Sequence, residues 1–151
     1  MDNPSPTPDG RAYGCPACGN DLTIESWENL GDSPCPHCSH LLWFVRKTVD
    51  DVVVLTFVPG LMLASESLDR VDEVRAAVGD ANRAVLDLSQ LNFLSSLFLG
   101  MLVALHRQME ADMGHLKICG IHPDNRESFR FTRLDTMLDI CEDEPGALGS
   151  F

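Results

Sequence analysis

Residues 85–100 read VLDLSQLNFLSSLFLG, and this stretch decides the class of fold. The apolar run over residues 84–88 predicts a buried strand, and the spacing of apolar residues over 97–113 predicts an amphipathic helix that Gly114 ends. A serine directly before such a helix is suited to act as an N-cap, because its oxygen can accept a hydrogen bond from a free backbone N–H. Ser95 and Ser96 both stand at this point, so the stretch predicts a strand, a turn and a capped helix.

Elements of the same two kinds follow one another on either side of this stretch. Further strands are expected at residues 42–57, as two strands around a turn, and at residues 116–121 and 138–141. Further helices are expected at residues 68–78, at residues 123–134 and in a short segment that begins at Glu144. Strands that alternate with helices imply parallel pairing with right-handed crossovers. The sequence therefore predicts the α/β class for residues 42–151.

The quoted stretch also resembles the core of a STAS domain, the domain of the anti-sigma-factor antagonist family. In that family a buried strand ends in a Phe-x-Asp-Ser-Ser-Gly-Leu-Gly turn that starts a helix, and the order of elements over about residues 42–148 is similar as well. The resemblance implies a mixed sheet with helices packed on one face. It also implies a signalling protein that acts in partner switching, by binding another protein.

Aligned without gaps, four residues of the stretch match the family turn: Phe93, Ser96, Leu99 and Gly100. In the family a kinase phosphorylates the serine that Ser96 matches, and phosphorylation decides which partner is held. The resemblance thus implies that Ser96 is a phosphorylation candidate, with the adjacent Ser95 as a second one. It further implies that an anti-sigma factor or a serine kinase binds the turn and the following helix. The candidate partner-binding residues are Leu97, Phe98 and Gly100.

Two departures from the family turn leave two hypotheses open. Ser95 stands where the family has Asp, and Leu97-Phe98 replaces a small Ser-Gly pair. Under the first hypothesis the switch is retained, and a phosphate at Ser96 changes the docking surface because it adds about two negative charges. Under the second the STAS scaffold has lost the switch, the serines only cap the helix, and Leu97 and Phe98 form a permanent apolar docking patch.

The N-terminal quarter of the chain carries a separate motif. Two cysteine pairs, Cys15-Pro16-Ala17-Cys18 and Cys35-Pro36-His37-Cys38, are separated by sixteen residues. Each pair folds two thiolates toward one point, and four thiolates form a closed tetrahedral site for Zn²⁺. We therefore expect a structural zinc ribbon at residues 11–41, with His37 and His40 outside the ligand set. Residues 1–10 are rich in Pro, Asp and Gly and predict a disordered tail.

Other interpretations of the cysteines are also possible. Four thiolates in two such pairs also describe a rubredoxin-like iron site, which would make the chain an electron-transfer protein, and ligand type alone does not choose between the metals. A disulfide framework is disfavoured because no signal peptide opens the chain. Cys119 and Cys141 stand inside apolar strand segments and are expected to be buried free thiols.

Charge and motif content restrict the function further. The chain has 11 Lys and Arg against 23 Asp and Glu, a net charge of −12, which disfavours binding to nucleic acid. No apolar run approaches the length of a membrane span, and no targeting peptide is present. Phosphate-binding glycine motifs and catalytic constellations are lacking too. Charge and motif content therefore predict a cytoplasmic protein that is not an enzyme, while the resemblance implies that it binds a regulatory protein.

Overall fold

The computed structural model describes residues 13–20, 22, 34–39, 42–58, 70–79, 81–91 and 93–151. The expected tail at residues 1–10 lies outside the described residues, as do the first two residues of the helix expected over 68–78. Within the described part of the chain, no helix combines the length and the apolar character that a bilayer span requires.

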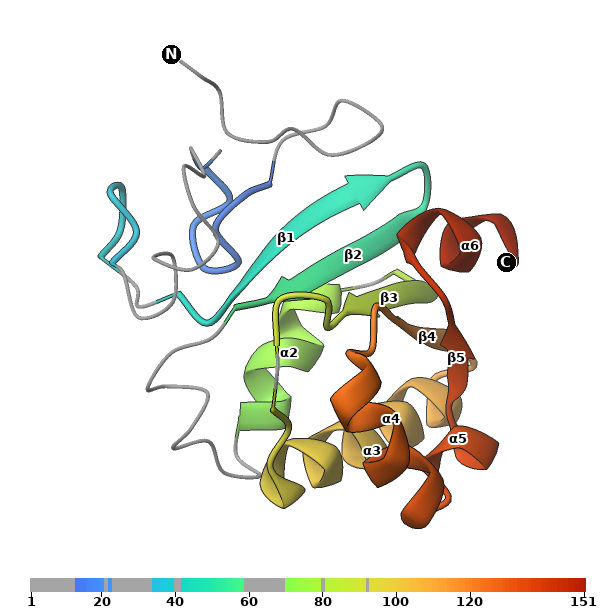
Figure 1. Ribbon diagram of the computed structural model, residues 1–151. Helices are drawn as coiled ribbons and strands as arrows, with labels where there is room; N and C mark the ends of the chain where they lie inside the picture. Colours follow the sequence, from blue (N-terminus) through green and yellow to red (C-terminus); the bar gives the residue numbers. More distant parts are fainter. Residues whose placement is uncertain are drawn as a thin grey trace.

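Five strands form one mixed sheet in the order β1-β2-β3-β4-β5, as Figure 1 shows. They are β1 (Phe44–Val49), β2 (Val52–Phe57), β3 (Arg83–Asp87), β4 (His115–Cys119) and β5 (Asp139–Cys141). β1 and β2 are an antiparallel hairpin around Asp50 and Asp51, and the three remaining pairs are parallel. The expected strands and the mixed α/β class are confirmed.

The described helices are α2 (Arg70–Val78), α3 (Ser96–Ala111), α4 (Pro123–Phe131), α5 (Leu134–Met137) and α6 (Glu144–Gly149). The single helix expected over residues 123–134 is divided, because Arg133 adopts a left-handed backbone with φ 62° between α4 and α5. The end of α3 also differs from the prediction. Met113, with φ 63°, is the left-handed residue there, and Gly114 follows it.

The main core lies between the sheet and the helices α2, α3 and α4, which cover one face (Figure 1). On β2, Val53, Leu55 and Phe57 point into this core, as the period of two along a strand requires. The ring of Phe57 packs against that of Phe98 from α3, with centroids 5.3 Å apart. Full burial of each such side chain contributes about 1.5–3 kcal/mol, so this layer dominates the stability of the fold.

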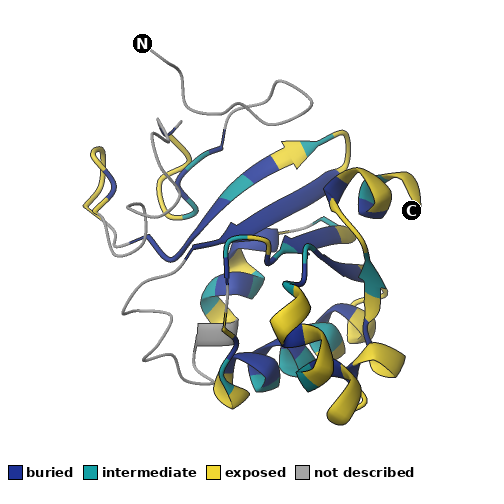
Figure 2. Ribbon diagram, in the orientation of Figure 1, coloured by how far each residue is buried: buried dark blue, intermediate teal, exposed yellow. Residues whose placement is uncertain are grey.

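α6 covers the opposite face of the sheet, so the prediction that the helices pack on one face is wrong for this helix. Ala147 of α6 packs with Val54 of β2, Val85 of β3 and Cys119 of β4. All six residues of β2 are buried, which Figure 2 shows as an unbroken dark blue strand. Burial on both faces explains why β2 is almost continuously apolar and does not alternate.

The first cysteine pair is attached to the edge of the sheet. Gly14 forms an antiparallel bridge with Arg46 of β1, with N–H to O distances of 2.6 Å and 3.0 Å in the two directions. Thr56 Oγ1 of β2 donates a 3.0 Å hydrogen bond to the hydroxyl of Tyr13, which is buried. A small cluster joins this segment to the strand; its members are Tyr13, Cys15, Leu22, Cys35, Leu42 and Val45. The segment therefore covers part of the β1 edge.

Candidate functional site

The four cysteines of the two pairs come together in space. Their sulfur atoms all lie within 4.8 Å of one another. The Sγ atoms of Cys15 and Cys38 are 3.7 Å apart, and those of Cys18 and Cys35 are also 3.7 Å apart. No disulfide joins any of the six cysteines, all of which are in the described residues.

Each pair is folded by the same local hydrogen bonds. Gly19 N–H donates to the carbonyl of Cys15 at 2.9 Å, and Ser39 N–H donates to that of Cys35 at 2.8 Å. The residue after each pair turns into the left-handed region, with φ 80° at Gly19 and φ 68° at Ser39. A glycine adopts this conformation without strain, whereas a serine rarely does, so the second turn is the more strained one.

Backbone N–H groups also point at the sulfurs. The N–H of Ala17 donates to Cys15 Sγ at 3.3 Å, and the N–H of His37 donates to Cys35 Sγ at 3.4 Å. The backbone N–H of Asn20 is the main reason that the pKa of Cys18 falls to about 6, whereas burial raises the pKa of Cys15 to about 12. A bound metal cation would favour the thiolate form of each cysteine. The metal coordinates the deprotonated sulfur, so its binding releases the thiol protons.

The donor set fits a tetrahedral metal ion. With metal–sulfur bonds of about 2.3 Å, the ligand sulfurs of a tetrahedral site lie about 3.8 Å apart, close to the 3.7 Å of the two measured pairs. A set of four thiolates leaves no open position on the metal for a substrate. A bound metal would therefore stabilise the fold of this segment and would not catalyse hydrolysis. The four cysteines can therefore bind a metal, and no histidine or carboxylate of the described residues joins their cluster.

The second candidate site is the turn between β3 and α3. Here the structure distinguishes the two serines. Ser95 is the N-cap of α3, since its Oγ accepts a 3.1 Å hydrogen bond from Phe98 N–H. Ser96 is the first helical residue and is exposed. Ser and Asp are both preferred N-caps, so Ser95 can cap α3 as an aspartate at this position would, without the negative charge.

The apolar residues around Ser96 have opposite environments. Phe98 is 1% exposed and belongs to the main core, so the prediction that its side chain forms a docking patch is wrong. Leu97 is 50% exposed and remains a candidate. Phe93, which precedes the helix, is 76% exposed. Gly100 lies one turn further along α3 and is half-buried.

Helical periodicity in the sequence could have shown that Phe98 is buried. The buried residues of α3 are Phe98, Leu99, Met101, Leu102, Leu105 and Met109, which repeat at intervals of three and four. Leu97 is outside that set. No comparable signal identifies Phe93, because an isolated aromatic residue in a turn can point either way.

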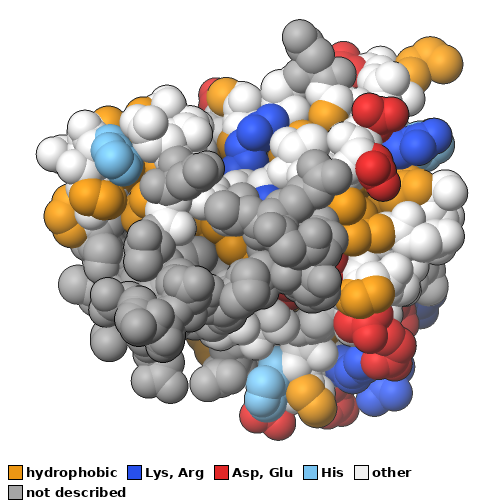
Figure 3. Space-filling model, turned by 90° about the horizontal axis from the view of Figure 1, so that it is seen from above, with side chains coloured by type: hydrophobic (Ala, Val, Ile, Leu, Met, Phe, Trp, Pro, Cys, Tyr) orange, Lys and Arg blue, Asp and Glu red, His pale blue; other side chains and the backbone are white. Residues whose placement is uncertain are grey.

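In the view of Figure 3, Lys and Arg side chains lie among Asp and Glu side chains instead of gathering in a basic patch.

Cys119 is buried, as expected, and its pKa is raised mainly by that burial. Cys141 is only half-buried, in contrast to the prediction.

Comparisons with known proteins agree with this architecture. The model of a family described as "Mlab, STAS domain" matches residues 51–139. An anti-sigma-factor antagonist (STAS) domain protein from Planctomyces limnophilus is 21% identical, with a TM-score of 0.60 over 71% of this chain and 96% of that chain. An anti-sigma factor antagonist from Mycobacterium paratuberculosis is 22% identical, with a TM-score of 0.59 over 71% and 91%.

A further similar structure comes from a study of the stressosome, described as a signal integration and transduction hub. It is 19% identical to this chain, with a TM-score of 0.60 over 70% of this chain and 93% of that one. At these identities the likeness shows a shared fold. A search of the curated proteins found no match.

Proposed function

Because the chain belongs to the STAS-domain family, we propose that it is a partner-switching protein that acts by binding and not by turnover. Its partner would be a regulatory protein, an anti-sigma factor or a serine kinase. The proposed docking surface, called the Ser96 surface below, consists of Phe93, Ser96 and Leu97. The buried Phe98 and the N-cap Ser95 fix the start of α3, which carries Ser96 and Leu97.

The exposure of Ser96 at the first position of α3 carries this proposal. Its side chain is open to a kinase, and exposed apolar side chains are present on either side of it in the sequence, at Phe93 and Leu97. The first turn of α3 contains no acidic residue that would repel a phosphate. The positive end of the helix dipole would stabilise the phosphate, and its added charge of about −2 would alter docking without disturbing the core.

The partner should first be isolated by purifying the protein from its own cells and identifying the proteins that elute with it. Intact-mass measurement on the same material reports whether a phosphate is present. The affinity of the partner is then measured for Ser96→Asp and Ser96→Ala. We expect Ser96→Asp to bind at least ten-fold more weakly than Ser96→Ala, because negative charge is introduced into the surface that docks.

Variants of the two exposed apolar residues test the docking surface itself, and the two Ser96 variants decide between a switch and a fixed patch. Phe93→Ala and Leu97→Ala should both weaken partner binding, because the proposed Ser96 surface contains these two side chains. Equal affinities for the two Ser96 variants, together with loss of binding in Leu97→Ala, would mean that the scaffold has lost the phosphoswitch. Unchanged partner affinity in all four variants would show that the partner binds outside the Ser96 surface.

We also propose that Cys15, Cys18, Cys35 and Cys38 bind one zinc ion with a structural role. The matched sulfur distances and the N–H groups aimed at the sulfurs support a closed thiolate site. Elemental analysis of protein prepared without chelator or an affinity metal should give one zinc per chain. Cys38→Ser should reduce that ratio, whereas Cys141→Ser, at a cysteine outside the cluster, should not. A red protein that contains stoichiometric iron would instead support the electron-transfer alternative.

A further inference from the structure

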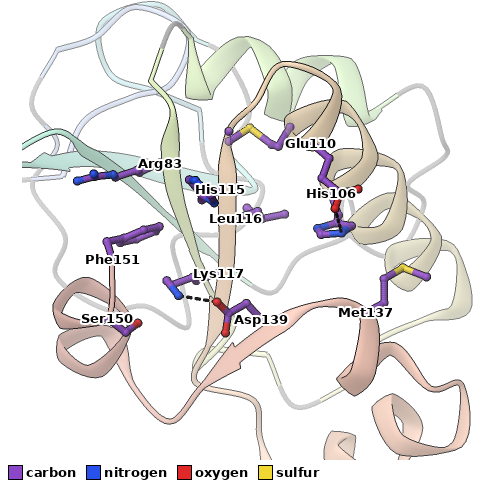
Figure 4. Close-up of a pocket in the computed structure, with 12 residues that line it drawn as sticks. Arg83, His106, Glu110, His115, Leu116, Lys117, Met137, Asp139, Ser150 and Phe151 are labelled. Carbon is purple, nitrogen blue, oxygen red and sulfur yellow. Dashed lines mark hydrogen bonds and ion pairs between the residues drawn. The ribbon is translucent and has the colours of Figure 1, made fainter.

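A crevice of about 330 Å³ lies at the end of the sheet opposite to the Ser96 surface. The turn with Ser96 follows the carboxyl end of β3, whereas the crevice is lined by Arg83, the first residue of that strand. His115 and Lys117 of β4 line it as well, and the last turns of α3 close it on another side (Figure 4). The crevice is therefore separate from the site proposed for partner binding.

One side of the crevice gathers cationic side chains. Arg83 and His115 are paired neighbours in the parallel register of β3 and β4, and Lys117 is two residues further along, on the same face. The ring of Phe151 lies between the two cations, with its centroid 5.0 Å from Lys117 Nζ and 5.8 Å from Arg83 Cζ. The lining as a whole is balanced in charge, because Glu110 and Asp139 offset Arg83 and Lys117.

The two cations differ in how they are compensated. Lys117 Nζ forms an ion pair with Asp139 at 2.5 Å. Arg83 is exposed and forms no ion pair with a carboxylate among the described residues. Its guanidinium is therefore available for an anionic group, which it can bind with two parallel hydrogen bonds.

The other side of the crevice is mixed, since Glu110 and His106 line it beside apolar side chains, with His106 Nε2 3.7 Å from a carboxylate oxygen of Glu110. Leu116 and Met137 line it, and Figure 4 shows them on the side of β4 away from Arg83 and Phe151. His106 is on this side too, and its Nδ1 is buried without a hydrogen-bond partner among the described residues. This nitrogen is closed to solvent, so it offers no contact to a ligand in the crevice.

From this arrangement we infer that the crevice binds a small organic anion. Its carboxylate or phosphate group contacts Arg83 and His115, and its apolar body lies along Leu116 and Met137. The volume is within the range of small-molecule sites and exceeds what an inorganic ion needs. Since α3 carries Ser96 at its start and His106 in its second half, the same helix contacts both proposed sites.

The test uses the full chain and three probes of matched size. They are 1-naphthyl phosphate, 1-naphthylacetate and the neutral 1-naphthalenemethanol, titrated while two-dimensional NMR spectra are recorded. We expect at least one anionic probe to shift the resonances of residues that line the crevice, with an affinity at least five-fold above that of the neutral probe. The phosphate and carboxylate arms show which anionic group the site prefers.

Arg83→Gln should reduce the affinity for the anionic probe at least five-fold. Its matched control is Arg126→Gln, which removes the same charge from an exposed arginine that pairs with Glu142 outside the crevice. Thermal unfolding of both variants checks that the fold is retained. Equal binding of the neutral probe, equal affinities of the two variants, shifts confined to other residues, or no shift at 10 mM probe would each overturn the inference.

Discussion

Phe98 and Leu97 are adjacent in the sequence but have opposite roles in the structure. Phe98 is 1% exposed and packs edge-to-face on Phe57, whereas Leu97 is 50% exposed. We expect Phe98→Ala to lower the free energy of unfolding by about 3–5 kcal/mol, because it leaves a cavity in the core. Leu97→Ala should change it by less than about 0.5 kcal/mol. Urea unfolding measures both, and equal effects would contradict the assigned burial.

The two serines at the start of α3 also have different roles. Ser95 Oγ accepts the N–H of Phe98, and Ser96 makes no comparable cap. Ser95→Ala should therefore lower the free energy of unfolding by about 1 kcal/mol, while Ser96→Ala should leave it nearly unchanged. Chemical denaturation of the two variants tests this assignment. A larger loss in Ser96→Ala would show that the helix begins one residue later.

The sequence predicted this site at the level of the segment but not of the individual residue. The strand, the serine cap and the helix all follow from local patterns. Ser95 and Ser96 are chemically equivalent as caps, so only the backbone geometry at residue 95 decides which one accepts the bond. Exposure of Phe93 depends on packing between distant elements, which no local pattern encodes.

At the scale of elements, the position of α6 was the main feature that the sequence did not predict. Its start at Glu144 was expected, but a six-residue helix carries too few residues to show which face it buries. The structure places it on the face of the sheet opposite to α3. One consequence is electrostatic: Glu144 forms an ion pair with Lys47 of β1, whose side chain is fully buried.

The pairing of Lys47 with Glu144 should be sensitive to the loss of one charge. Glu144→Gln is expected to lower the free energy of unfolding by roughly 3 kcal/mol, since it weakens the compensation of a buried ammonium group. The double variant Lys47→Met with Glu144→Gln should recover much of this loss, because it removes the buried charge as well. Denaturant unfolding of the single and double variants gives the coupling free energy between the two side chains. A double variant less stable than Glu144→Gln alone would contradict this account.

At the scale of the whole molecule, the order of elements predicted the α/β class, and together with the turn motif in residues 85–100 it indicated the STAS-like fold. The way the cysteine segment attaches to the sheet was not predicted. Composition changes near residue 41, which suggested two separate modules. In the structure the bridge from Gly14 to Arg46 and the packing of Tyr13 cross that boundary. Such contacts join residues more than thirty positions apart, so no local pattern could reveal them.

Deletion of residues 1–40 tests how far the two parts depend on each other. Among the described residues, every member of the main core lies after position 41, so we expect the shortened chain to keep a cooperative thermal transition. Its stability should nevertheless fall by about 3 kcal/mol, because the buried ring of Tyr13 and its contact with Lys47 are lost.

Tyr13→Ala in the full chain separates the packing of this residue from the effect of the metal. If Tyr13 provides most of the coupling, this variant should lose nearly as much stability as the deletion while retaining its metal content. Removing the metal with a chelator from the unaltered chain should then lower the melting temperature too, because Cys15 lies two residues beyond Tyr13 in the same cluster. A shortened chain without a cooperative transition would show that the sheet requires the cysteine segment to fold. An unchanged melting temperature in all three experiments would show that the segment is energetically independent of the sheet.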